Sequence, residues 1–307
     1  MSSKYFLPFL LLQALFSAFT ASAQVAREDS YIVVERYSGR VLLADNSERK
    51  HAMGDFCQIA TAKVALDWSV ASKTSLSTKM VVPPYVTDGG TNNLGLRPGD
   101  VITMRDAIYA SSMVGDGACA LALADFVGKN ILNRRMRGGN PVATFVAEMN
   151  NLAQKINMRS TRFSHPSSSL QMTTPSDMAR LARSVVQTKG YNFYVKQRSR
   201  KVTVTGADGA ERKLTLTNTN RLVGVSGVSG LKAQGFNSVL SVDRKPHVVK
   251  VGVGGSKVTP RQLVVIVFGN AQKEVRAKQL ITEGWKLYDA WHASGFPASK
   301  DRKEYLK

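Results

Sequence analysis

The sequence places a lysine where it could assist a nucleophile, but the nucleophile position is empty. Lys63 follows Ala60 by three residues in the stretch 56–70, F-C-Q-I-A-T-A-K-V-A-L-D-W-S-V. On a helix, residues three apart lie on one face, one turn apart. A serine at the first position would hold its hydroxyl beside an amine that helps to take its proton. The methyl group of Ala60 cannot attack a carbonyl, so this pattern predicts a reactive site without its reactive oxygen.

Other side chains are weak replacements for the missing nucleophile. Ser229 precedes Lys232 by three residues, but positions i and i+3 of a strand face opposite sides. Thr61 points about 100° away from Ala60 around a helix, and Cys57 comes before the predicted helix begins. An active hydrolase with a non-standard nucleophile stays open as an alternative. The four histidines lack the spacing of metal ligands, so we expect no metal and no other cofactor.

The stretch 56–70 predicts a buried helix, because apolar residues recur along it and neither Gly nor Pro interrupts it. Thr103 is expected to cap the start of a later helix. On a C-terminal helix, 273–292, we expect a buried side that carries Val275, Leu280, Ile281, Trp285 and Tyr288. Further helices are predicted at 118–127, 141–157 and 174–188, hairpins at 31–44 and 202–217, and strands at 228–232, 236–242 and 262–268.

This order of strands, helical block, strands and helix favours an α/β (α+β) fold. We expect an antiparallel sheet built from both ends of the chain, with a helical lobe inserted between them. Residues 1–23 are predicted to be a signal peptide, which has a positive charge at Lys4, an apolar run and the small residues Ala21-Ser22-Ala23 before the cleavage site. The domain is then expected at 24–297, followed by a charged and frayed tail at 298–307. Export without a later membrane span predicts a periplasmic or extracellular protein.

The chain is strongly basic, with 42 Lys and Arg against 22 Asp and Glu. In an exported protein this charge favours anionic partners, such as peptidoglycan or another polymer of the cell envelope. Nucleic acid is not expected, because no recognition motif accompanies the charge. A basic surface with no specific partner remains the alternative. The only two cysteines, Cys57 and Cys119, are expected to be small buried side chains.

Seven segments in a fixed order carry a resemblance to a known family. They are Y-I-V-V-E-R-Y-S-G-R-V-L-L, I-A-T-A-K, L-R-P-G-D-V-I-T-M-R-D, A-C-A-L-A-L-A-D, F-V-A-E-M-N-N-L-A-Q-K-I-N-M-R-S-T-R-F, T-T-P-S-D-M-A-R-L-A-R and N-T-N-R-L-V-G-V-S-G-V-S-G-L-K. The chain resembles the D-alanyl-D-alanine carboxypeptidases, low-molecular-mass penicillin-binding proteins that share the fold of class A β-lactamases. The resemblance covers about 31–291. It implies a serine-type peptidase fold and the D-Ala-D-Ala end of peptidoglycan stem peptides as the substrate class.

The resemblance also implies three catalytic motifs, and each is altered in this sequence. The motif S-x-x-K aligns with Ala60 and Lys63, and S-x-N aligns with Gly115-Asp116-Gly117. The motif K-T-G aligns with Lys232-Ala233-Gln234, where Gln234 replaces a glycine that lets backbone approach ligand. These alignments predict an inactive, wall-binding pseudoenzyme in which Lys63 and Lys232 mark a residual anion site.

Overall fold

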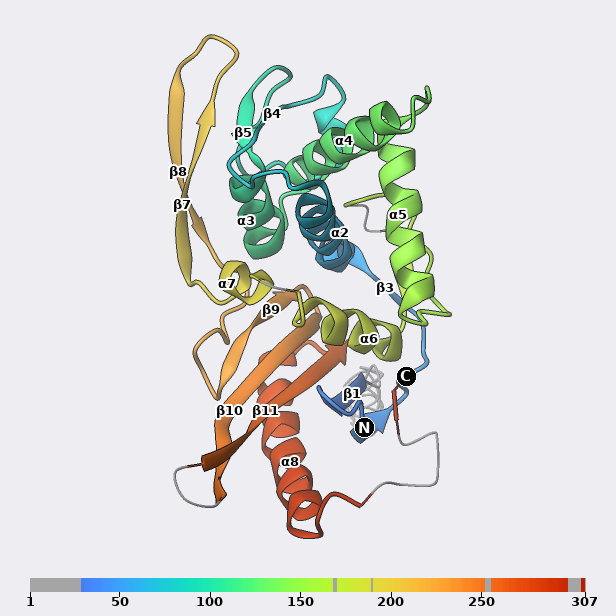
Figure 1. Cartoon of the computed structure of the whole chain (residues 1–307), viewed down its shortest axis with the longest axis vertical. Coiled ribbons are helices and arrows are strands. Elements are labelled where there is room, and N and C mark those ends of the chain that lie inside the picture. Colours follow the sequence, from blue (N-terminus) through green and yellow to red (C-terminus); the bar gives the residue numbers. More distant parts are fainter. Residues whose placement is uncertain (1–28, 168–169, 189, 252–254, 298–304, 307) are drawn as a thin grey trace, which may run out of the picture.

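The computed structural model describes residues 29–167, 170–188, 190–251, 255–297 and 305–306. The predicted signal peptide, 1–23, lies outside the described residues. Figure 1 shows an elongated molecule with a sheet and one long helix at one end and a helical lobe at the other.

The main sheet has five strands in the order β2-β1-β11-β10-β9, and every neighbouring pair is antiparallel. The first and last strands of the chain pair directly, because Ser30 lies opposite Phe268 and Glu35 opposite Leu263. This confirms the predicted sheet built from both chain ends. The strands are β1 (Ser30–Glu35), β2 (Val41–Asp45), β9 (Val228–Gln234), β10 (Asn237–Val251) and β11 (Gly255–Phe268).

The two faces of the sheet are covered by different helices. Alternate residues of a strand point to opposite faces, so Val265 packs toward α8 (Lys273–Ala293), whereas Val264 and Ile266 face the helical lobe. Four of the five residues predicted for the buried side of α8 are buried, but Val275 is 54% exposed. Five residues separate Val275 from Leu280, which is about 140° around the helix.

The lobe surrounds α2 (Cys57–Ser72), the helix predicted at 56–70, with apolar contacts on most of its sides. Thr103 caps α3 as predicted, accepting a hydrogen bond from the Asp106 N–H. The caps of α4, α5 and α6 are Asp116, Asn140 and Thr174. The surrounding helices are α3 (Met104–Val114), α4 (Gly117–Arg134), α5 (Pro141–Lys155) and α6 (Pro175–Val185).

Two smaller sheets and three short helical turns complete the described fold. The predicted hairpin at 202–217 extends a four-stranded sheet, β4-β5-β7-β8, along the side of the lobe (Figure 1). Among the described residues no helix has the length and apolar character needed to cross a bilayer. The remaining elements are β3 (His51–Ala52), η1 (Gly54–Phe56), β4 (Lys79–Val81), η2 (Val86–Gly89), β5 (Val101–Thr103), β6 (Met172–Thr173), α7 (Tyr191–Val195), β7 (Ser199–Thr205) and β8 (Glu211–Thr217).

The end of the predicted frayed tail is docked on the domain. Tyr305 forms an antiparallel bridge with Arg40, and the Leu306 N–H donates to the Gly39 carbonyl at 2.8 Å. The carbonyl of Leu306 accepts from Arg183 on α6, and its side chain is only 6% exposed. Expecting the whole tail to fray was therefore wrong for 305–306, because a buried leucine and backbone hydrogen bonds hold these residues.

Candidate functional site

Lys232 lies at the junction between the main sheet and the helical lobe. It belongs to β9 and is 2% exposed. Its ammonium donates to the Ser111 carbonyl of α3 at 3.1 Å and to Gln58 Oε1 of α2 at 3.4 Å. The lysine therefore connects the sheet with two helices of the lobe.

Gly115, at the end of α3, marks the point where these groups meet. A β-carbon at Gly115 would lie 2.7 Å from Asp55 Oδ2, 3.0 Å from Gln234 Oε1 and 3.2 Å from Lys232 Nζ. Its φ of +73° suits a residue without a side chain. Four elements, η1, α2, α3 and β9, thus converge on one polar cluster, which we define as Asp55, Gln58, Gly115, Lys232 and Gln234.

The environment of this cluster changes the pKa of its ionisable neighbours. Burial lowers the pKa of Lys232 to about 8, and the opposing attraction of Asp55 limits the fall. Burial also raises the pKa of the Cys57 thiol to about 12, with a further contribution from Asp55. Cys57 therefore stays a protonated thiol at neutral pH and is no nucleophile.

Ala60 and Lys63 do not join the polar cluster. Gln58 is the residue of α2 that reaches Lys232, and Ala60 and Lys63 lie about 200° and 140° away from it around the helix. Ala60 is fully buried in the lobe. Lys63 donates to Asp67 at 2.7 Å and to the Thr188 hydroxyl at 2.9 Å. An ammonium held by a carboxylate has no lone pair with which to take the Thr188 proton.

The structure therefore corrects the helical register predicted for the first motif. The pair with i,i+3 spacing that faces Gly115 and Lys232 is Asp55 and Gln58, not Ala60 and Lys63. The physical reason is accessibility: residue 55 lies just before α2, beside the cluster, whereas residue 60 faces apolar neighbours. The alternative nucleophile Thr61 is also buried, and its hydroxyl donates to the Pro166 carbonyl at 2.7 Å.

Comparison with known proteins places the chain in a family. Residues 17–238 match the family model described as D-alanyl-D-alanine carboxypeptidase. The chain belongs to the D-alanyl-D-alanine carboxypeptidase family. It is 22% identical over 257 residues to D-alanyl-D-alanine carboxypeptidase DacF of Bacillus subtilis (strain 168), an alignment that covers 78% of this chain and 60% of that relative's length.

Solved structures support the same fold. The Streptomyces K15 DD-transpeptidase aligns with a TM-score of 0.66 at 21% identity, over 85% of this chain and 96% of that one. Penicillin binding protein 6B from Escherichia coli aligns with a TM-score of 0.62 at 20% identity, over 85% of this chain and 76% of that one. These similarities confirm the predicted DD-peptidase-like fold.

The glycines of the second motif have different neighbours in this carboxypeptidase-family chain. Gly115 faces the polar cluster, but a β-carbon at Gly117 would lie 1.9 Å from the Gly89 carbonyl oxygen. Gly117 therefore permits close packing of α4 against η2 and presents no side chain to a ligand. Its N–H donates to the Thr91 hydroxyl at 2.9 Å.

The third motif divides between the two faces of β9. Lys232 and Gln234 lie two residues apart, so both point toward the cluster. Ala233 points the other way and is 2% exposed. Gln234 Oε1 is buried and has no hydrogen-bond partner among the described residues. The predicted site residues of this motif are thus brought to Gly115, with Ala233 as a packing residue.

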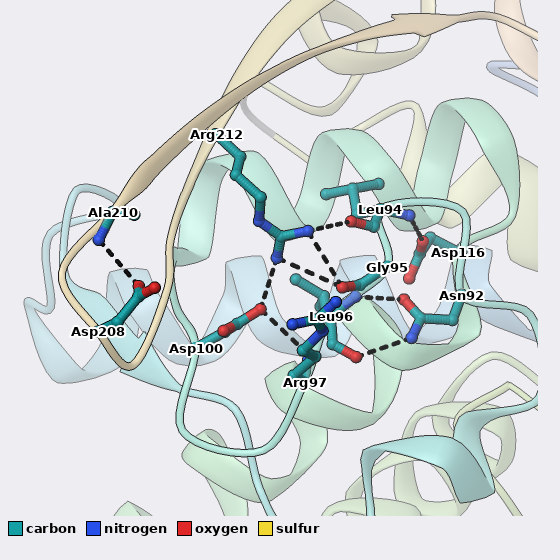
Figure 2. A network of polar contacts seen from close by, with 10 residues as sticks. All are labelled: Asn92, Leu94, Gly95, Leu96, Arg97, Asp100, Asp116, Asp208, Ala210 and Arg212. Atoms are coloured by element: carbon teal, nitrogen blue, oxygen red, sulfur yellow. Dashed lines mark hydrogen bonds and ion pairs between the residues drawn. The ribbon is translucent and has the colours of Figure 1, made fainter.

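A polar network fixes the loop 91–100 and joins it to Asp116, the residue that follows Gly115 (Figure 2). Arg212 of β8 pairs with Asp100 at 2.6 Å and donates to the Gly95 carbonyl at 3.3 Å. At the other end of the loop, Asp116 accepts from the Leu94 N–H at 3.0 Å. Asp116 also caps α4, so one carboxylate joins the loop to the helix that follows Gly115. The residues around Gly115 are therefore held from two sides.

Asp55 and Gln58 were not singled out from the sequence. The lysine at position 63 fits S-x-x-K, and this match shifted the alignment of the first motif by five residues. One signal could have found Asp55: a nucleophile must be accessible, and Asp55 lies just before the predicted helix, whereas Ala60 lies within its apolar run. Asp55-Phe56-Cys57-Gln58 keeps the motif's spacing with both functional groups replaced.

Proposed function

We propose that this family member is a pseudoenzyme, which binds cell-wall material without cleaving it. The observation that carries the proposal is the chemistry of the polar cluster. Asp55 and Gln58 stand at the positions of the serine and lysine of S-x-x-K, Gly115 at that of the serine of S-x-N, and Gln234 at that of the glycine of K-T-G. The first two replacements remove the hydroxyl that would form an acyl-enzyme and the amine that would assist it.

The remaining groups do not supply an equivalent reaction. An amide such as Gln58 holds no proton-accepting nitrogen, and the Asp55 carboxylate lies near the buried Lys232 cation, which lowers its nucleophilicity. Loss of a catalytic nucleophile alone costs about 10⁶-fold in a serine peptidase. Three altered motifs at one point therefore favour binding over turnover.

The charge of the chain supports attachment to the cell envelope. A formal net charge of +20 attracts anionic polymers. Such polymers occur in the cell envelope, which an exported protein would reach. Peptidoglycan is the partner that fits the family. We propose that the basic surface strengthens attachment and that the former catalytic cleft provides selectivity.

One observation favours a second candidate, a hydrolase with a relocated nucleophile. Ser167 Oγ lies 3.3 Å from His165 Nδ1, beside the same cleft. However, this hydroxyl donates to the Gly89 carbonyl at 2.7 Å, and the same ring nitrogen accepts from the Ser167 N–H at 3.2 Å. A nitrogen whose lone pair is already used is a poor base for Ser167.

Two assays run together test the proposal. Purified protein is incubated with labelled penicillin and with a peptide ending in D-Ala-D-Ala, and an active family enzyme is treated identically. We expect neither covalent label nor D-Ala release above background. Covalent acylation at any residue would overturn the pseudoenzyme, and loss of that label in Ser167→Ala would identify the relocated nucleophile.

A salt series tests the part played by the basic surface. The fraction of protein that co-sediments with purified peptidoglycan should fall between about 0.05 and 0.5 M salt, because salt screens the surface charges. The fraction that remains bound at high salt should fall in Asp55→Asn, which removes one charge from the polar cluster. If all binding vanished with salt and the variant behaved as the parent, the surface alone would account for attachment.

A further inference from the structure

The turn between α4 and α5 carries three arginines around a methionine. Its residues Arg134, Arg135, Met136 and Arg137, which we call the basic turn, are all exposed. Met136 is 93% exposed, the highest value among the large apolar side chains of the described residues. Figure 1 shows this turn at the end of the helical lobe that is remote from the main sheet. The basic turn is therefore accessible to a large partner.

The backbone of the basic turn has a conformation that methionine disfavours. Met136 has a φ of +48°, and its N–H donates to the Asn133 carbonyl at 3.1 Å. The Arg137 N–H donates to the Leu132 carbonyl at 3.2 Å, and these two bonds close the end of α4. Glycine is the usual residue at this position, because a β-carbon is strained at a positive φ. Met136 therefore lowers the stability of the chain, and strain at an exposed residue favours a role in binding.

Two arginines of the basic turn have no acidic partner. Arg135 pairs with Glu148 at 3.0 Å. Among the described residues, no carboxylate lies within ion-pair distance of Arg134 or Arg137. The helix dipole favours a positive charge in the last turn of a helix, which explains Arg134 but not Arg137, beyond the end of α4. Two positive charges are thus left for an external anion.

The end of α2 adds a further cation and a further apolar side chain. The Arg134 guanidinium donates to the Ser72 carbonyl at 3.3 Å, so the ends of α2 and α4 lie together. Lys73, the next residue, is exposed and forms no ion pair with any described carboxylate. Val70, two residues before Ser72, is 74% exposed. Basic and apolar groups are therefore combined at this end of the lobe.

This combination distinguishes between classes of anionic partner. Guanidinium groups bind the phosphates of any polyanion, including a nucleic acid. Only a bilayer surface also offers acyl chains to an apolar side chain that protrudes between basic residues. Among the described residues no helix is able to span a bilayer, so contact through the basic turn would be peripheral.

We propose that the basic turn binds the surface of an anionic lipid bilayer. Arg134 and Arg137 contact the phosphates of the headgroups, and Met136 inserts among the first acyl carbons. The inference goes beyond the proposed function, because no residue of the basic turn belongs to the polar cluster.

Co-sedimentation with lipid vesicles tests the proposal. The chain from Gln24 onward is used, because the apolar run of the predicted signal peptide would itself enter a bilayer. The vesicles contain phosphatidylcholine alone or equal parts of phosphatidylcholine and phosphatidylglycerol. We expect at least tenfold tighter binding to the anionic vesicles at about 0.1 M salt. A short DNA duplex at the same phosphate concentration is the soluble polyanion for comparison.

A charge-matched pair of double variants locates the binding. Arg134→Gln with Arg137→Gln should weaken binding to anionic vesicles by about 25-fold, roughly fivefold for each basic residue removed. Lys278→Gln with Lys286→Gln removes the same charge from exposed positions of α8, at the other end of the molecule (Figure 1). This control should weaken binding by less than about twofold, because salt screens distant charges.

Met136 separates a bilayer from a soluble polyanion. Met136→Gly removes the apolar side chain and relieves the strained φ, so the melting temperature should rise by about 1–3 °C. Binding to anionic vesicles should weaken by about fivefold or more, whereas binding to the duplex should not change. A loss of binding that accompanies a gain in stability cannot result from unfolding. Val275→Gln, at a 54% exposed valine of α8, is the apolar control and should leave vesicle binding unchanged.

Three results would overturn the inference: equal binding to neutral and anionic vesicles, equal losses in the two double variants, or unchanged vesicle binding in Met136→Gly. Tighter binding to the duplex than to anionic vesicles would also overturn it, because the turn would then recognise a soluble polyanion. None of these results depends on acylation by penicillin, so failure of this inference leaves the proposed function intact.

Discussion

At the scale of single residues, the cluster depends on a carboxylate where the family's motif has a hydroxyl. Asp55 fills space that a side chain at position 115 would need, since its Oδ2 lies 2.7 Å from the position of a β-carbon there. It also attracts the buried Lys232 cation. Residues 55, 115 and 232 are therefore coupled, and a change at one alters the effect of a change at another.

A double-mutant cycle measures the coupling of Asp55 to Gly115. Gly115→Ala should lower the free energy of unfolding by about 2–4 kcal/mol, because a positive φ and a close contact add. In an Asp55→Ala background the nearest contact is gone but those with Gln234 Oε1 and Lys232 Nζ remain, so the cost should fall by about 1–2 kcal/mol. Urea unfolding of the four proteins gives both values.

Gly90→Ala is the control for this cycle. Gly90 has φ of +82°, and a β-carbon there would meet nothing within 4 Å. Gly90→Ala should therefore lower the free energy of unfolding only by the cost of its positive φ, and by the same amount in the parent chain and in the Asp55→Ala variant. Equal costs of Gly115→Ala with and without Asp55 would show that the two residues are not coupled.

Lys232 predicts a dependence of stability on pH. Its pKa is about 8 in the folded chain, below the ordinary 10.5. Between these values the unfolded chain binds more protons, so the free energy of unfolding rises with pH. The free-energy cost of burying the charged Lys232 ammonium is fully present below pH 8 and decreases above it, as the buried amine loses its proton. The total rise is on the order of 3 kcal/mol.

Lys232→Met, which has no titrating group at this position, isolates the effect. Urea unfolding at pH 7, 9 and 10.5 should give a stability difference, parent minus variant, that increases across this range. Other lysines and tyrosines titrate in both proteins and cancel in the difference. A difference that stays constant with pH would contradict the assigned pKa.

At the scale of elements, α2 presents different residues to the cluster and to the core. Its start lies beside β9, and its second turn is enclosed by the lobe. The helix thus contributes to the cluster only through η1 and its first turn. Lys63 has a separate role, because its bond to Thr188 joins α2 to the segment after α6, whereas its bond to Asp67 lies within the helix.

Ala60→Ser tests this division of α2. The side chain at residue 60 is fully buried, so its hydroxyl would lie in the core. We expect a loss of about 1–3 kcal/mol in stability and no labelling by penicillin. Labelling of this variant, measured beside the parent chain, would restore Ala60 to the nucleophile position.

At the scale of the whole molecule, segments from both ends of the chain pack together in one domain. β1 and β11 pair at the centre of the sheet, and Leu306 returns to the turn between β1 and β2. Arg183 joins this end of the chain to α6 by donating to the Leu306 carbonyl. The described C-terminal residues are therefore part of the domain.

Leu306→Ala should lower the free energy of unfolding by about 2–3 kcal/mol, the cost of truncating a buried leucine. Met136→Ala is the control, because Met136 is 93% exposed and its truncation should cost little. Thermal unfolding monitored by circular dichroism measures both. Equal melting temperatures for the two variants would mean that Leu306 is not held in solution.

The sequence by itself determined the architecture. Alternation of apolar residues in the strands, the uninterrupted run of α2 and the cap at Thr103 are local signals, so they predicted the sheet from both chain ends and the inserted lobe. Lys232, Gln234 and Gly115 were identified in another way, through the resemblance of the segments around them to the carboxypeptidase family.

Only the tertiary structure decided which end of α2 meets these residues. Both Ala60-x-x-Lys63 and Asp55-x-x-Gln58 have one-turn spacing, and spacing alone cannot distinguish them. The choice depends on how α2 is rotated against β9, which is set by apolar packing between segments far apart in sequence. The carboxylate in the cleft, and the unpartnered oxygen of Gln234 beside it, follow from that packing.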